Sequence, residues 1–194
     1  MRKNIPSALP FWLLLALSLA LLAQEPTRPQ HWAHPIALDG VPNLHQVADG
    51  IYRSAQPTAA GFRQLQELGV QRVLSLRHEP DDQSLAAGLG MTLLHISMSA
   101  WYIRDQEVIA ALKLMLDAHQ APILIHCRHG ADRTGVVCAA YRIVCQNWRT
   151  EDAIAEMVEG GFGHHQIFHN IRNYLANLKV EEIRAELAED DPLE

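Results

Sequence analysis

The sequence HCRHGADRTG, residues 126–135, follows directly on the apolar run Ile123-Leu124-Ile125. An apolar helical pattern begins after Thr134, so the chain here is predicted to form a strand, a tight turn and a helix. The N–H groups of such a turn point inward and the helix N-terminus adds positive potential, which together create an anion-binding site. Cys127 in that position is stabilised as a thiolate, and thiol pKa values in such surroundings fall to about 3.5–7.5. Arg133, six residues after the cysteine, can return across the turn and hold an oxyanion with two N–H groups.

This stretch resembles the signature of the cysteine-dependent protein phosphatases. The signature is Cys-x5-Arg-Thr/Ser with a preceding His and an internal Gly, matched here by Cys127, Arg133, Thr134, His126 and Gly130. The sequence is most similar to the compact dual-specificity type and, within it, to bacterial, exported tyrosine phosphatases. A buried thiol is the alternative interpretation of the cysteine taken alone.

A second stretch, Tyr-Arg-Ser-Ala-Gln-Pro at residues 52–57, is similar to the opening of the bacterial dual-specificity phosphatases. In that family it ends the first strand beside the active site. An ordinary strand followed by a proline turn is the alternative for its polar side chains. The resemblance covers residues 45–180, strongly at the loop and weakly elsewhere.

Composition and charge set limits on the class of protein. The chain has 194 residues, of which 48% are hydrophobic and 20% charged, and its formal net charge is −6. These values are typical of a globular protein with one full core, and the negative charge argues against a nucleic-acid partner. Three cysteines without regular spacing do not form a disulfide framework.

The N-terminal segment predicts export. Arg2 and Lys3 precede the uncharged run FWLLLALSLALLA at residues 11–23, which is typical of a secretory signal and short for a membrane span of about 20 residues. Residues 1–23 are therefore expected to be a signal peptide or an N-terminal membrane anchor. The protein would then be periplasmic, either soluble or attached to the inner membrane.

The remaining chain divides by composition. Residues 24–42, rich in Pro and His, are expected to be a linker of low order, residues 43–180 the phosphatase catalytic domain, and residues 181–194 an acidic, frayed C-terminal tail. Strands and helices alternate early and helices cluster late, which predicts an α/β fold with a compact, mostly parallel sheet flanked by helices. The family resemblance implies the same dual-specificity-phosphatase-like fold. The strands are expected at 51–54, 73–76, 91–96 and 123–125, and the helices at 58–69, 84–87, from 105, after 134, from 150 and around 167–178. Thr58 is expected to cap the first of these helices.

The resemblance implies roles for the residues of the loop. Cys127 would be the nucleophile that forms a phosphocysteine intermediate, Arg133 would bind two equatorial phosphate oxygens, and Thr134 would donate its hydroxyl to the departing sulfur. Gly130 allows the tight curl. No metal or other cofactor is expected, because the loop itself supplies the positive charge.

The other loop residues are predicted to bind substrate. The backbone N–H groups from Arg128 to Arg133 complete the phosphate cradle, and the side chains of Arg128 and His129 either contact the substrate or lie at the rim. The Asp132 carboxylate is expected to point outward. The predicted substrate-binding residues are Arg128, His129, Gly130, Ala131, Asp132 and Thr134.

The proton donor for the leaving oxygen is expected outside the phosphate loop. The family places an Asp on a loop upstream of the strand that leads to the cysteine, which here is the segment 97–105. Its only acid is Asp105, whereas close bacterial relatives have the acid about where Trp101 falls. Asp105 is therefore the predicted general acid, with helix capping as the alternative, and Asp81 and Asp82 are further candidates.

Other titratable residues are interpreted as structural. His164, His165 and His169 are expected on a solvated face rather than at a zinc site. Cys138 and Cys145 lie in an apolar helical pattern and are expected in the core.

The sequence thus predicts hydrolysis of phosphotyrosine, with phosphoserine and phosphothreonine as further candidate substrates. Two alternatives stay open: a phosphatase of phosphoinositides or other small phosphoesters, and a phosphate-binding module with weak turnover. In the loop, Arg128 and His129 are offset by Asp132, which disfavours a polyanionic substrate. The expected partner is a phosphorylated protein or a small phosphoester, with membrane attachment possible only through residues 1–23.

Overall fold

The computed structural model describes residues 28–116 and 121–189. The predicted signal peptide or anchor at residues 1–23 lies outside the described residues. Within the described ranges no helix is both long enough and apolar enough to cross a membrane. Residues from His31 onward form one compact unit, and this unit is the fold described below.

A six-stranded sheet forms the centre of this unit, in the order β1-β2-β3-β6-β4-β5. The four strands β3, β6, β4 and β5 are mutually parallel, whereas β1, β2 and β3 pair antiparallel. The predicted α/β class is confirmed, and the two short N-terminal strands make the sheet mixed. The strands are β1 (His34–Pro35), β2 (His45–Ala48), β3 (Ile51–Ser54), β4 (Arg72–Ser75), β5 (Thr92–His95) and β6 (Ile123–His126).

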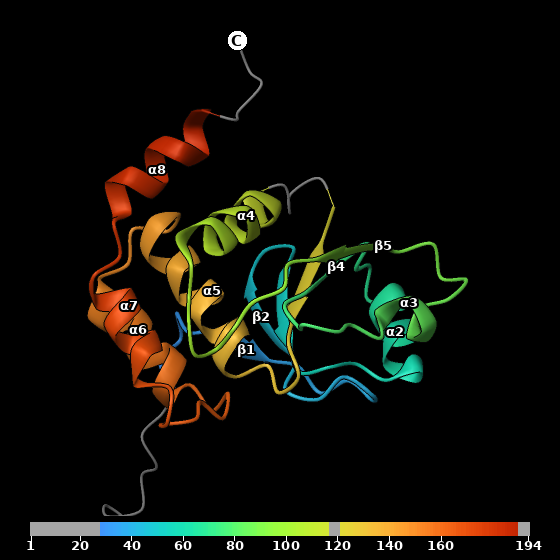
Figure 1. Cartoon of the computed structure of the whole chain (residues 1–194). Coiled ribbons are helices and arrows are strands. Elements are labelled where there is room, and N and C mark those ends of the chain that lie inside the picture. Colours follow the sequence, from blue (N-terminus) through green and yellow to red (C-terminus); the bar gives the residue numbers. More distant parts are fainter. Residues whose placement is uncertain (1–27, 117–120, 190–194) are drawn as a thin grey trace, which may run out of the picture. The chain divides into compact units, whose positions relative to one another are not determined.

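Helices cover both faces of the sheet (Figure 1). The helices α2 and α3 pack with the smaller apolar cluster on one face, and the helices from α4 to α8 with the larger cluster on the other. Thr58 caps the first of them as the sequence predicts, because its hydroxyl accepts a hydrogen bond of 3.1 Å from the Gly61 N–H. The helices are α2 (Ala59–Glu67), α3 (Asp82–Leu85), α4 (Asp105–Leu116), α5 (Asp132–Val144), α6 (Thr150–Glu159), α7 (His169–Ala176) and α8 (Val180–Glu189).

The strand β6 is the centre of the core. It lies between β3 and β4 and is buried along its whole length. Its side chains alternate between the two faces, with Ile123 and Ile125 in the larger cluster and Leu124 in the smaller one. Burial on both faces explains why residues 123–125 of this strand are continuously apolar rather than alternating.

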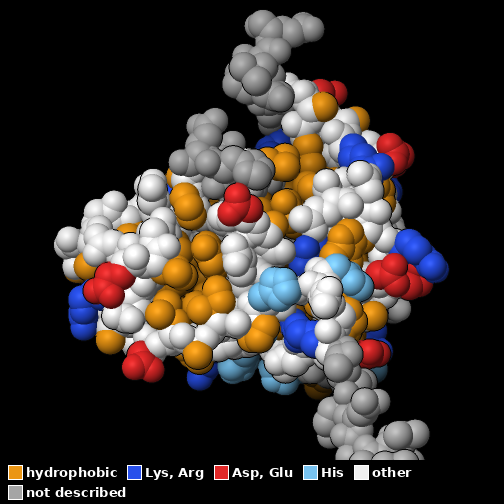
Figure 2. Space-filling model, turned by 180° about the vertical axis from the view of Figure 1, so that it is seen from behind, with side chains coloured by type: hydrophobic (Ala, Val, Ile, Leu, Met, Phe, Trp, Pro, Cys, Tyr) orange, Lys and Arg blue, Asp and Glu red, His pale blue; other side chains and the backbone are white. Residues whose placement is uncertain are grey.

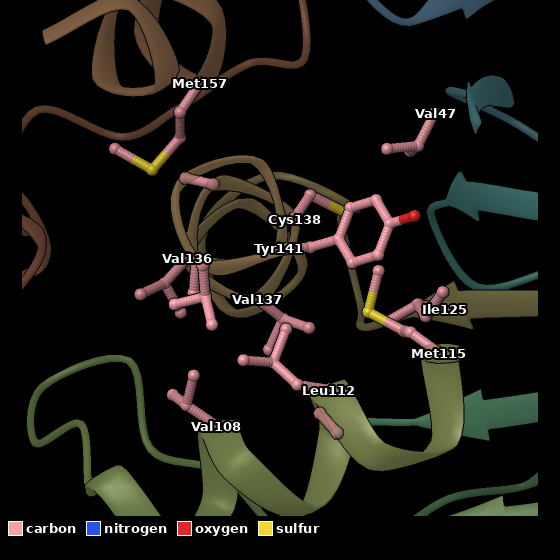
Figure 3. Packing of buried hydrophobic residues seen from close by; sticks show 14 of the residues in the cluster. Val47, Val108, Leu112, Met115, Ile125, Val136, Val137, Cys138, Tyr141 and Met157 are labelled. Atoms are coloured by element: carbon pink, nitrogen blue, oxygen red, sulfur yellow. The ribbon is translucent and has the colours of Figure 1, made fainter. Parts of the chain in front are cut away.

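The helix α5 is buried nearly all round and anchors the other end of the turn. Figure 3 looks along this helix, with Val108 and Leu112 of α4 packed beneath Val136 and Val137 and with Met157 of α6 on the opposite side. The residues that connect β6 to α5 are therefore held between two rigid, packed elements.

The predicted linker and tail differ from the structure. The linker was expected to extend to residue 42, but the chain is packed from His31: Ala33 and Val41 are buried, and the Ala33 N–H donates to the Glu156 carboxylate at 2.6 Å. The prolines and histidines of this segment predicted low order, although the segment also contains apolar side chains that pack in the core.

The acidic segment from residue 181 belongs mostly to a helix, α8, rather than to a frayed tail. Ile183 is 2% exposed within the larger core cluster, and the Arg184 guanidinium donates to the Val144 carbonyl at 3.0 Å. Ile183 is the one fully buried side chain of α8, and the partly buried Val180 and Leu187 pack against the same cluster, which docks the helix although its overall composition is acidic. Residues 190–194 lie outside the described residues.

The docking of α8 can be tested by Ile183→Ala. We expect the substitution to lower the free energy of unfolding by about 2–5 kcal/mol, because it removes a buried side chain and leaves a cavity. Denaturant unfolding measures this change, and Glu186→Ala on the exposed face of the same helix is the matched control. Equal stabilities of the two variants would show that α8 contributes nothing to the core.

Candidate active site

The loop between β6 and α5 curls at the carboxyl end of the sheet. Gly130 has φ +69°, and a Cβ on this residue would lie 2.5 Å from the Ser54 backbone. The Gln56 N–H donates to the Arg128 carbonyl at 3.3 Å, and the Leu76 N–H donates to the His126 carbonyl at 2.8 Å. These hydrogen bonds hold the loop against the residues that follow β3 and β4. Glycine is required where the loop lies closest to β3, because a side chain there would collide with the backbone.

Arg53, on β3, supports the loop from beneath. It is fully buried, and its Nη2 donates to the Gly130 carbonyl at 2.6 Å, while its guanidinium lies 3.6 Å from the centre of the Phe162 ring. Burial lowers the pKa of Arg53 from its ordinary value. The sequence assigned no role to this residue, although the Tyr-Arg-Ser-Ala-Gln-Pro stretch that contains it was the available signal.

His126 and Asp82 form a buried pair behind the loop. The Nε2 atom of His126 lies 3.0 Å from the Asp82 Oδ2 atom, and its Nδ1 atom lies 3.3 Å from the Cys127 carbonyl oxygen. Gln56 donates to the other oxygen of Asp82 at 2.7 Å. Burial alone raises the pKa of Asp82, but the hydrogen bonds with His126 and Gln56 outweigh that effect and lower it.

The two further acid candidates are therefore not placed as proton donors. Asp82 is ionised and engaged beneath the loop, and Asp81 is an exposed residue in an ion pair of 3.0 Å with Arg77. Neither residue lines the cavity above Cys127.

Cys127 lies at the base of that cavity and is almost fully buried. Burial alone raises the pKa of its thiol. The hydroxyl and N–H of Thr134, the charge of Arg133 and the N–H of His129 outweigh burial, so the pKa is lowered from its ordinary value. The buried Thr134 hydroxyl has no other hydrogen-bond partner among the described residues, which leaves it available to the sulfur.

The Arg133 side chain reaches the chain that follows β4. Its Nη1 donates to the Leu76 carbonyl, which follows β4, at 3.1 Å. This contact holds the guanidinium at the edge of the cavity that also contains the Cys127 sulfur. A fixed, planar donor beside a thiolate is suited to binding a tetrahedral oxyanion.

The cavity measures about 410 Å³ and has a largely apolar wall. Trp101 stands at its rim, 62% exposed, with its ring centre 4.7 Å from that of Phe168. The segment before α4, the segment before α7 and the loop after β6 all contribute to the wall. The lining residues are His78, Met98, Ser99, Ala100, Trp101, Cys127, His129, Asp132, Arg133, His165, Ile167 and Phe168.

The Asp132 carboxylate does not point outward as predicted. Its Oδ2 lies 2.7 Å from His165 Nδ1, its Oδ1 accepts the His165 N–H at 3.0 Å, and His164 Nδ1 lies 3.1 Å from Oδ1. Burial alone raises the pKa of Asp132, but the two histidines outweigh it and the pKa is lowered. The chain between α6 and α7 returns over the start of α5, and this return brings the histidines to the carboxylate.

The predicted solvated face is consequently wrong for His164, whereas the His165 side chain is 47% exposed. The His164 side chain is 1% exposed, and His165 lines the cavity, while His169 is exposed at the start of α7. In the described part of the chain, no three His, Cys, Asp or Glu side chains are grouped to hold a metal ion. Cys138 is buried in the core, as expected, and Cys145 is half-buried.

Asp105 is not brought to the cavity. It is the first residue of α4, and its carboxylate accepts a hydrogen bond of 2.9 Å from the Tyr174 hydroxyl, in a separate hollow that includes Tyr102 and Lys179. Burial, followed by this carboxylate, raises the pKa of Tyr174. The segment 97–104 passes the cavity at Ser99–Trp101 and has left it by residue 105, so the predicted general acid lies on the wrong side of this segment.

Comparison with known proteins gives a consistent result. The family described as "Tyrosine phosphatase family" matches residues 41–191. The dual specificity protein phosphatase TpbA of Pseudomonas aeruginosa strain PAO1 is 34% identical over 163 residues, which are 84% of this chain and 73% of TpbA.

Solved structures are similar over the same region. A crystal structure of P. aeruginosa TpbA has a TM-score of 0.76 and 33% identity, and a substituted TpbA in complex with pTyr has 0.75 and 34%; each comparison covers 84% of this chain and 99% of the other. The core catalytic domain of the PP-IP phosphatase SIW14 from S. cerevisiae, in complex with citrate, has a TM-score of 0.69 and 25% identity, covering 81% of this chain and 98% of that domain.

Thr134→Val tests the effect of the hydroxyl on the nucleophile. Loss of the hydroxyl should raise the pKa of Cys127, so the pH midpoint for alkylation by iodoacetamide should move upward, because only the thiolate reacts. Thr134→Ser retains the hydroxyl and should keep the midpoint of the unsubstituted protein. An unchanged midpoint in the valine variant would remove Thr134 from the stabilisation of the thiolate.

Gly130→Ala tests the closeness of the loop to β3. We expect a loss of about 1–3 kcal/mol in unfolding free energy from the strained φ, and loss of inorganic phosphate binding because the Cβ displaces the loop from Ser54. Gly88→Ala is the matched control, since Gly88 has φ +80° with nothing within 4 Å of its Cβ position. Calorimetric titration with phosphate and denaturant unfolding separate the two effects, and retained phosphate binding in Gly130→Ala contradicts the analysis of the loop.

Proposed function

The chain belongs to the tyrosine phosphatase family, and on this basis we propose that it hydrolyses phosphotyrosine through a phosphocysteine intermediate. The observation that best supports this proposal is that Cys127 lies at the base of a cavity with an aromatic rim and that the pKa of its thiol is lowered. Phosphoserine and phosphothreonine are secondary substrates of the same chemistry.

The loop performs the first chemical step. The Cys127 thiolate attacks phosphorus, the S–P bond forms, and the bond to the ester oxygen breaks. The loop N–H groups and the Arg133 guanidinium hold the equatorial oxygens, whose charge they stabilise in the transition state. Gln56, Leu76 and Arg53 keep the loop in the required shape before substrate arrives.

Thr134 acts in the second step. Water attacks the phosphocysteine, the S–P bond breaks, and the sulfur leaves as a thiolate. The same hydroxyl that lowers the pKa of Cys127 stabilises that leaving group.

The wall of the cavity favours an aromatic ester. Trp101 and Phe168 meet edge to face at an interplanar angle of 66°, and Ile167 is 62% exposed on the same wall. The phenyl ring of phosphotyrosine covers this apolar wall, whereas the methylene group of phosphoserine is too small and leaves the wall exposed to water. Phosphotyrosine should therefore have the lower KM.

The likeness to the PP-IP phosphatase SIW14 suggests a second candidate, a small polyphosphate ester. Three histidines, His78, His129 and His165, border the cavity and offer ring nitrogens as hydrogen-bond donors to phosphate oxygens. Arg133 is, however, the only Lys or Arg among the lining residues, and Asp132 opposes it. The charge balance favours a phosphate with one ester over a polyanion.

Export remains part of this proposal. The N-terminal segment supports a periplasmic protein, soluble or anchored, because Arg2 and Lys3 precede the apolar run at residues 11–23. The resemblance of the chain to exported bacterial phosphatases supports the same location. On the face shown in Figure 2, Lys and Arg side chains are scattered rather than gathered, which supports a protein or small-molecule partner over nucleic acid.

Activity measurements test the proposal. Cys127→Ser should retain phosphotyrosine binding and lose turnover, and Arg133→Lys should lower kcat about 10²–10³-fold, because lysine cannot supply two parallel donors. Phosphate release is measured from phosphotyrosine and phosphoserine peptides and from an inositol pyrophosphate. Turnover by Cys127→Ser, or a preference for the inositol ester, contradicts the proposal; tight binding without release in the unsubstituted protein indicates a phosphate-binding module.

A further inference from the structure

The cavity above Cys127 contains one carboxylate, and this group is not a proton donor. Among the lining residues only Asp132 is acidic. Its two oxygens face His164 and His165, and its pKa is lowered, so the carboxylate is ionised at neutral pH. Asp105 lies in another hollow. The ester oxygen must therefore receive its proton from a different kind of group.

His165 has the geometry of a histidine oriented for proton transfer. Asp132 Oδ2 lies 2.7 Å from its Nδ1, and Asp132 Oδ1 accepts its backbone N–H at 3.0 Å. One carboxylate thus holds both the ring and the backbone of the same residue. Because Nδ1–H is directed at Asp132, Nε2 is the nitrogen left to exchange a proton with the cavity that the ring lines. A carboxylate orients a catalytic imidazole in the same way in serine hydrolases.

Among the described residues, no carboxylate pairs with the other two histidines of the cavity. His78 Nδ1 lies 2.8 Å from the uncharged Ser97 hydroxyl. The His129 ring contacts the His165 ring, with 5.3 Å between ring centres, and the His129 backbone carbonyl accepts a hydrogen bond from the Asn43 side chain. Of the three cavity histidines, His165 alone has a carboxylate on its ring among the described residues, and this carboxylate, Asp132, fixes the position of the ring.

Titratable and aromatic groups face His165 from three parts of the chain. Asp132 faces it from α5, His129 from the loop after β6, and the Phe168 ring stands at 90° to it with 6.2 Å between ring centres. Cys127 and Arg133 line the same cavity and carry opposite charges. The ring is half-exposed, so it can meet the ester oxygen of a substrate that enters from solvent.

We propose that His165, oriented by Asp132, is the general acid that protonates the leaving oxygen, in place of the loop aspartate that the sequence predicted. This inference rests on the proposed phosphatase function. As the S–P bond forms and the P–O bond breaks, the electron pair passes to the ester oxygen, which takes the proton from His165 Nε2. The neutral imidazole keeps its Nδ1–H on Asp132.

The same residue acts in reverse in the second step. Neutral His165 accepts a proton from the water that attacks the phosphocysteine, and the Cys127 thiolate leaves as the S–P bond breaks. The imidazolium is restored and no external acid or base is consumed. Asp132 is a positioning residue in both steps, since it acts only through the ring.

The test compares leaving groups in His165→Asn, whose side-chain amide keeps a donor for Asp132 but lacks Nε2. Phosphotyrosine, whose leaving group is a poor one, should turn over about 10²–10⁴-fold more slowly. 4-Nitrophenyl phosphate, whose leaving group needs no proton, should change less than about tenfold. The alkaline limb of the kcat–pH profile should disappear. His169→Asn, on an exposed histidine outside the cavity, is the matched control.

Asp132→Asn supplies the second variant. It removes the negative charge beside the imidazolium, so the alkaline limb should move toward lower pH, whereas a purely structural role would reduce kcat equally at every pH. The unsubstituted protein adds a measurement that needs no variant: its rates should depend little on the leaving group below the alkaline limb and strongly above it.

The outcomes separate the inference from the function on which it rests. If the unsubstituted protein releases no phosphate from phosphotyrosine, the proposed function fails. If it does, but His165→Asn slows both esters equally and keeps the alkaline limb, only the role of His165 fails. Loss of that limb in His129→Gln instead would move the acid to His129 and overturn the assignment.

Discussion

The structure depends on one tight turn, the passage of the chain from β6 into α5 through Gly130. Its backbone N–H groups can converge on an anion only if the loop approaches β3 without a side chain in between. Arg53, buried beneath, binds the Gly130 carbonyl at 2.6 Å and so keeps this carbonyl away from the anion. A carbonyl that turned inward would oppose the phosphate. The burial of β6 on both faces and of α5 nearly all round supplies the rigidity for this arrangement.

Two histidine–carboxylate pairs flank this turn and serve different purposes. The inner pair, His126 and Asp82, is buried and lies against the backbone of the loop, where it shapes the site. The outer pair, His165 and Asp132, has a half-exposed ring in the substrate cavity. Burial thus separates a structural pair from a pair that can exchange a proton with substrate. The lowered pKa of both carboxylates follows from their hydrogen bonds with histidine, which outweigh the cost of burial.

Short-range sequence patterns were reliable where local physics decides the outcome. The strand before Cys127, the helix after it, the glycine of the turn and the cap at Thr58 all follow from neighbouring residues, and the structure has them. The predictions for Asp105 and Asp132 did not hold, because the direction of a carboxylate depends on partners far along the chain. Their partners are 69 and 33 residues away, respectively.

The sequence by itself determined the phosphate loop, its nucleophile Cys127 and its arginine, because strand, turn and helix signals are local and their order brings these groups together. Only the tertiary structure decided the support and the proton chemistry. Arg53 reaches the loop across 77 residues and His165 reaches Asp132 across 33, and no periodicity or spacing encodes such contacts. The packing of the segment between α6 and α7 over the start of α5 makes the second contact, and composition had indicated only solvated histidines there.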